Sequence, residues 1–203
     1  MEHKTFWNEA AKWGVIVGLL LSVSFVVENL ITVSGKMWLY YLMMLEWIGV
    51  VVLHFWLLLR FAQNRSRLYG AAVGFTFGQG YGAVMTVSAF AGVIVGVVQA
   101  VYLHLIVGYS NHIERIIAAV TELVFKSGSQ MPASMEGLLS QSFQQLQAAP
   151  VPSVLQTVWG GLFSALFFGA VFGLIIAAIT TRAPRPFDET NEESDGMNDN
   201  AVE

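Results

Sequence analysis

The sequence predicts an all-α integral membrane protein with four transmembrane helices, and three observations support this fold class. Of the 203 residues, 55% are hydrophobic and only 12% are charged, whereas soluble domains contain about 25% charged residues. Several apolar stretches reach the length of about 20 residues that a helix needs to cross a bilayer. The cations gather in alternate connections, as is typical of multi-pass proteins.

Four stretches meet the length requirement. The predicted spans cover about residues 13–33, 38–61, 80–107 and 154–180. The first is longer than the apolar core of a cleavable signal peptide, and no Ala-x-Ala-like site ends it. We therefore expect it to be retained as a helix.

The region before the third span needs a break. Residues 69–107 carry no charge, and as one helix they would be much longer than a bilayer is thick. The glycine-rich sequence from Phe75 to Gly82 is the expected place for the break, because glycine weakens a helix. The sequence thus predicts a short interfacial or re-entrant segment at 69–79 and a span from about Gly80, with two short spans as the alternative.

The cation distribution predicts the orientation of the spans. One side of the membrane would carry seven of the ten cations. These are Lys4, Lys12, Arg60, Arg65, Arg67, Arg182 and Arg185, against Lys36, Arg115 and Lys126 on the other side. The positive-inside rule then places both termini in the cytoplasm.

Two segments lie outside the predicted spans. Residues 108–152 show apolar residues at helical spacing and should form a periplasmic insertion of two amphipathic helices. We expect this insertion to dock on its own bundle. The alternatives are that it lies on the membrane surface or binds a partner. Residues 1–185 form the transmembrane domain, and the acidic segment 186–203 should be a disordered cytoplasmic tail.

Small residues recur at four-residue spacing in three of the predicted spans. In lipid, such stripes let helix backbones approach closely. The glycines expected to pack helices together are Gly14, Gly18, Gly92, Gly96, Gly161, Gly169 and Gly173. Homodimerisation through the last span is the alternative use of the stripe.

A few polar residues interrupt the apolar spans, and such residues are functional candidates because they are costly in lipid. The candidate intramembrane polar site consists of Glu28, Asn29, Glu46, Gln99 and His104. It would hold a cation, a proton or a lipid headgroup in the outer half of the membrane. The alternative is a structural clasp in which Glu46 hydrogen-bonds a neighbouring helix. His54, beside two aromatic residues, is expected to be a packed or interfacial histidine.

The sequence contains no recognisable catalytic or cofactor motif. It lacks cysteine and paired metal-ligand spacings, so no catalytic residue, metal or cofactor is predicted. The net charge of −4 argues against nucleic acid, which needs a basic face.

Three segments resemble a known family of membrane proteins. They are Phe75-Thr-Phe-Gly-Gln-Gly-Tyr81 after a basic turn, the polar helical insertion before the last span, and the ending Arg182-Ala-Pro-Arg-Pro-Phe-Asp188. Together they resemble the bacterial membrane proteins grouped as domain of unknown function 4199, although Tyr81 stands where phenylalanine is expected. The resemblance implies a four-span inner-membrane protein and transfers no catalytic residue.

Two functions are then expected, and neither is enzymatic. The first is an accessory or assembly subunit that contacts lipid and a protein partner or a second copy. The second is a small transporter, channel or lipid-handling protein that uses the polar site. The sequence shows no internal repeat of the kind that many transporters have.

Overall fold

The protein is described by a computed structural model over residues 2–34, 36–70, 73–126 and 133–184. Throughout these residues the regular structure is helical. The elements are α1 (Glu2–Ser34), α2 (Met37–Ser66), α3 (Phe77–Ala100) with a π-helical continuation (Val101–Ile106), α4 (Tyr109–Lys126), α5 (Ala133–Ala148) and α6 (Val154–Thr180). Residues 127–132, within the predicted insertion, and the predicted tail at 186–203 lie outside the described residues.

Four of the described helices are long and apolar enough to cross a membrane, which confirms the all-α, four-helix part of the predicted fold. The segments that meet this criterion in the described chain are Phe6–Ser34, Trp38–Ser66, Phe77–Ile106 and Val154–Thr180.

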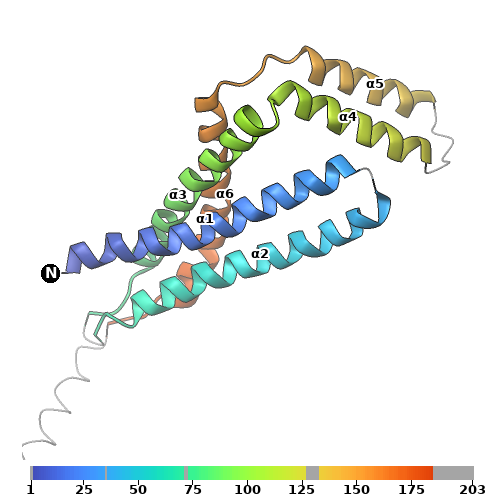
Figure 1. The fold of residues 1–203 in the computed structure, drawn as a ribbon. Coiled ribbons are helices and arrows are strands. Elements are labelled where there is room, and N and C mark those ends of the chain that lie inside the picture. The colour runs from blue at the N-terminus through green and yellow to red at the C-terminus, as the bar shows by residue number, and fades with distance from the viewer. Residues whose placement is uncertain (1, 35, 71–72, 127–132, 185–203) are drawn as a thin grey trace, which may run out of the picture.

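The four long helices form a bundle with α3 at its centre (Figure 1). Helix α3 packs most extensively against α6 and next against α1, while α2 packs against α1 and, less closely, α6. We call the end with the α1–α2 turn and α4–α5 the hairpin end. The opposite end, where α3 begins and α6 ends, is the basal end. The buried core between the helices includes Val17, Leu58, Val84, Val87 and Ile176.

The seven glycines named above all face a neighbouring helix. Gly14 and Gly18 lie against Phe90 and Ala91 of α3. The remaining five lie at the contact between α3 and α6. There Gly92 lies against Leu162, Gly96 against Val158, Gly161 against Gly96, Gly169 against Ser88, and Gly173 against Tyr81. Because the glycines let the backbones approach, van der Waals contact replaces the hydrophobic driving force that lipid cannot supply.

Helix α3 starts earlier than the sequence predicted, at Phe77 instead of about Gly80. The Thr76 hydroxyl accepts a hydrogen bond from the Gln79 amide at 3.3 Å, and the Gln79 side chain accepts one from the Thr76 amide at 2.8 Å. This capping box fixes the helix start. The glycines at 78, 80 and 82 are therefore helical, and the break lies before Thr76.

The segment before α3 is joined to the end of α6 by a short bridge. The Phe75 amide donates to the Arg182 carbonyl at 3.0 Å, and the Arg182 amide donates to the Phe75 carbonyl at 2.8 Å. Gly74 has a φ of 69°, and a Cβ there would lie 2.6 Å from the Arg182 oxygen. Two of the segments that resemble the family are thus in direct contact.

Helices α4 and α5 follow the π-helical turn at the hairpin end (Figure 1). Helix α4 packs against α1, and α5 packs against α4. His112 of α4 is buried, and its ring lies edge-on to Tyr102, which in turn meets Phe25 of α1. Helix α5 leaves Leu138 and Leu146 exposed.

Candidate functional site

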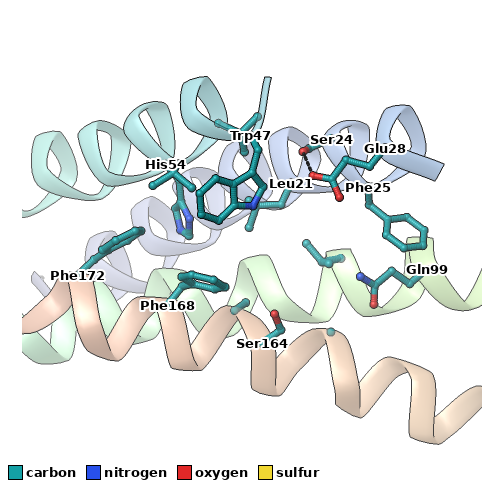
Figure 2. Close-up of a pocket in the computed structure, with 15 residues that line it drawn as sticks. Leu21, Ser24, Phe25, Glu28, Trp47, His54, Gln99, Ser164, Phe168 and Phe172 are labelled. Carbon is teal, nitrogen blue, oxygen red and sulfur yellow. Dashed lines mark hydrogen bonds between the residues drawn. The ribbon is translucent and has the colours of Figure 1, made fainter. Parts of the chain in front are cut away.

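A cleft of about 170 Å³ is lined by all four long helices (Figure 2). Its polar lining comes from five side chains, which are Ser24 and Glu28 of α1, His54 of α2, Gln99 of α3 and Ser164 of α6. We call this the polar cleft. Ser164 is exposed, so the cleft is open at α6.

Helical periodicity brings the lining residues of α1 and α2 to the cleft. On α1 they are Leu21, Ser24, Phe25 and Glu28, and on α2 they are Trp47, Val50, Val51 and His54. Both sets repeat at three- and four-residue spacing, which places each set on one helix face. Aromatic and aliphatic side chains therefore surround the polar groups.

The Glu28 carboxylate is only partly satisfied by the protein. The Ser24 hydroxyl donates to its Oε1 at 3.1 Å, as Figure 2 shows. No side chain in the described part of the chain donates to its other oxygen, Oε2. Glu28 therefore keeps an acceptor for a ligand or water.

His54 is a packed histidine, as the sequence predicted, but it also lines the polar cleft, which sequence reasoning missed. Its side chain is buried, and Nε2 has no hydrogen-bond partner among the described residues. The ring lies edge-on to Phe172, with the centroids 5.3 Å apart. The signal available in the sequence was its spacing from Trp47, Val50 and Val51, which places it on the same face of α2.

Of the five polar residues named from the sequence, the structure brings Glu28 and Gln99 to the cleft. The Gln99 carboxamide lies beside Gly161. Asn29 instead donates to the Phe25 carbonyl of its own helix at 2.6 Å. His104 Nε2 lies 2.9 Å from the Thr157 hydroxyl, away from the cleft.

Glu46 lies outside the lining of the polar cleft. Glu46 Oε2 is buried, and within the described ranges it has no hydrogen-bond partner. The structure therefore shows no hydrogen-bonded clasp between this oxygen and another helix.

A second hollow adjoins the polar cleft. It has a volume of about 280 Å³ and is lined by Glu28, Met43, Met44, Trp47 and Ile48. Glu28 and Trp47 border both spaces. A polar compartment and an apolar one thus meet at the same two side chains.

The cleft offers groups that could bind a cationic ligand. An unpaired carboxylate oxygen beside the rings of Trp47 and Phe25 is a favourable environment for an ammonium group. Over the residues that the structure describes, no group of three or more His, Cys, Asp or Glu side chains is arranged to hold a metal ion.

Comparison with known proteins identifies the family of the chain. Neither a curated protein nor a solved structure matches the chain significantly. The sequence profile of the family described as "Protein of unknown function (DUF4199)" matches residues 12–182. This match takes in the greater part of all four long apolar helices, the polar cleft and the Phe75–Arg182 bridge, and the chain therefore belongs to that family.

Proposed function

We propose that this protein is a non-enzymatic membrane protein that binds an amphipathic molecule with an amine-bearing head group in the polar cleft. The observation that carries the proposal is the junction of the two spaces at Glu28 and Trp47. The head group would occupy the polar cleft, and an acyl chain would occupy the hollow beside Met43 and Met44.

The unsatisfied polar atoms support a bound ligand. In hydrocarbon, a polar group without a partner costs several kcal/mol. Glu28 has a free oxygen, and His54 Nε2 is buried without a partner in the described chain. An ammonium group at Glu28 and a hydroxyl or phosphate oxygen at His54 would satisfy both.

The proposed setting is the outer leaflet of a bacterial inner membrane, with both termini in the cytoplasm. The cation bias supports this orientation, because the basal end carries Arg60, Arg65, Arg67 and Arg182. The polar cleft lies toward the hairpin end, where α1 ends and α6 begins.

Native mass spectrometry of delipidated protein tests the proposal. After phosphatidylethanolamine is added back, we expect the wild type to bind and retain one molecule of it. Ser164→Trp should block the cleft and abolish retention, and Glu28→Gln should weaken it by roughly tenfold, the effect of losing one charge-assisted contact. Equal retention by the wild type and both variants would refute the proposal.

Ala178→Trp provides the matched control. Ala178 is exposed on the same helix and does not line the cleft, so a bulky residue there should leave lipid retention unchanged. Loss of retention in the control would mean that the assay reports general damage to α6.

An accessory role is the second candidate, and α5 is the feature that favours it. Helix α5 packs against α4 and exposes Leu138 and Leu146, which are 64% and 45% exposed. Replacing both leucines with glutamine should release a protein partner during purification in mild detergent without loss of lipid retention.

A further inference from the structure

A third cavity lies at the basal end of the bundle, apart from the polar cleft and its adjoining hollow. It has a volume of about 390 Å³, and its lining includes Trp7, Arg65, Tyr69, Gly78, Gln79 and Gly82. We call it the Arg65 groove. From its positive charge, its glycine-lined surface and its position at the basal end, we propose that this groove binds one anionic phospholipid. The phosphate would lie at Arg65 and an acyl chain along α3.

Arg65 places a largely buried positive charge with few partners in the groove. Its side chain is only 11% exposed, and its one ion pair in the described residues is a single contact of 3.3 Å from Nη1 to Glu9. The guanidinium also lies over the Phe6 ring, with Cζ 5.0 Å from the ring centroid. A guanidinium has five N–H donors, so most of them lack an acceptor within the described chain.

The neighbouring side chains add donors of the right kind. The Gln79 carboxamide oxygen is engaged by the Thr76 amide, which leaves its NH₂ group available. Tyr69 packs its ring on Phe75 and has a hydroxyl without a partner in the described residues. Phosphate oxygens accept from guanidinium, amide and hydroxyl groups together.

The floor of the groove is formed by two glycines that do not pack helices. A Cβ at Gly78 or Gly82 would meet nothing within 4 Å, in contrast to the glycines at the α1–α3 and α3–α6 contacts. Each helical glycine costs about 1 kcal/mol relative to alanine. No neighbouring helix in the described chain packs against these two glycines. The uncovered strip that they form on α3 therefore allows an acyl chain to approach the helix backbone closely.

The position of the groove fits a lipid at the membrane surface. Arg65 and Gly78 stand at the ends of two span-length helices, and Trp7 is 52% exposed at the rim, where tryptophan commonly marks the interface. The cytoplasmic leaflet, to which the cation bias assigns this end, attracts basic groups to its anionic lipids.

Glu9 gives the proposal its sharpest test. Its side chain is 47% exposed, so it can leave Arg65 when a phosphate arrives, and it competes with that phosphate for the guanidinium. Glu9→Gln should therefore tighten the binding of phosphatidylglycerol several-fold, whereas Arg65→Gln should weaken it by roughly tenfold. A purely structural ion pair would make both variants less stable and would leave lipid binding unchanged.

Titration of delipidated, full-length protein with phosphatidylglycerol, read by native mass spectrometry, measures these effects. Gly82→Leu should abolish binding of the single lipid by filling the groove. Gly49→Leu is the matched control, because a Cβ at Gly49 also meets nothing within 4 Å and Gly49 does not line the groove. If Arg65→Gln fails to fold, the Glu9 and Gly82 variants still decide the question.

The remaining arms separate the possible occupants. Ser164→Trp, which blocks the polar cleft, should leave phosphatidylglycerol binding intact, so the two sites can fail independently. If millimolar inorganic phosphate displaced phosphatidylglycerol completely, the groove would be assigned to free phosphate and the lipid proposal would be overturned. A dimer that disappears in Gly82→Leu would assign the groove to a second copy of the chain and overturn it as well.

Discussion

Glu46 places a carboxyl group in an apolar stretch of α2, with one buried oxygen that lacks a partner in the described chain. A buried polar atom that makes no hydrogen bond destabilises the fold, and replacing it with an apolar group of similar size is neutral or favourable. The Glu46 oxygen therefore does not stabilise the fold. Glu28 differs, because its carboxylate accepts a hydrogen bond from Ser24 and faces the polar cleft.

Glu46→Leu should leave the free energy of unfolding unchanged or raise it by about 1 kcal/mol, and Glu46→Gln should be nearly silent. Thermal unfolding in mild detergent measures both. A strong loss of stability in the leucine variant, with glutamine tolerated, would restore the hydrogen-bonded clasp that the sequence suggested.

His112 should make the stability of the hairpin end depend on pH. Burial lowers the pKa of His112 below its usual 6.5, and the positive charge of Arg115 lowers it further. As pH falls below 6.5, the unfolded chain takes up a proton that the folded chain resists, so stability is lost until the folded pKa is passed.

Replacing His112 with glutamine removes this proton linkage. Between about pH 7.5 and 5.5, we expect the Tm of the wild type to fall by a few degrees more than that of His112→Gln. The comparison cancels the other histidines, which both proteins share. Parallel pH profiles would show that His112 titrates alike in the folded and unfolded states.

At the scale of the elements, α3 and α6 form the closest helix pair. Their contact is built on small residues, and the cost of enlarging one depends on what it would meet. A Cβ at Gly169 collides with the Ser88 side chain, close to its backbone. A Cβ at Gly173 meets the edge of the Tyr81 ring at 3.1 Å, a looser contact with side-chain atoms only.

Leucine at Gly169 should therefore destabilise the bundle by about 3 kcal/mol or more, with a smaller loss for Gly173→Leu. Gly160→Leu is the control in the same helix, because a Cβ at Gly160 meets nothing within 4 Å. Thermal unfolding in detergent gives the order. Equal losses at all three positions would mean that leucine disturbs α6 irrespective of the α3 contact.

The whole molecule has four span-length helices in the described residues, and an even number of spans returns the chain to the starting side. With a single cysteine introduced at the exposed position Ser140 or Asn64, an impermeant thiol reagent on intact spheroplasts should modify position 140 only. The chain has no native cysteine, so the background is low. Modification at position 64 but not at position 140 would invert the orientation.

Much of this architecture was predictable because length and composition dominate in lipid. Apolar stretches longer than a bilayer crossing predict helices, and no close competitor to the helix exists for them. The glycines predict a start of α3 near Gly80, but the capping pair Thr76 and Gln79 fixes the start at Phe77. A cap fixes a boundary more sharply than a composition shift does.

The candidate site was less predictable because it depends on how the helices cross. The spacing along α2 gives the helix face on which His54 lies, but it does not tell which helix that face meets; His54 lines the polar cleft because α2 packs against α6. His104 turns toward Thr157 instead. It lies in the π-helical turn, where the Val107 amide bonds the Tyr102 carbonyl, and this wider turn shifts the faces of the helix from their α-helical positions.

The Phe75–Arg182 bridge bears on the order in which the bundle is assembled. Helix α3 lies at the centre of the bundle, yet its main partner is the last of the four spans to be synthesised, and the bridge uses a residue that follows that span. During translation, α1–α3 must therefore wait in the membrane with the glycine face of α3 uncovered. A nascent chain that stops before Arg182 cannot form the bridge, so its formation reports that all four spans have been made.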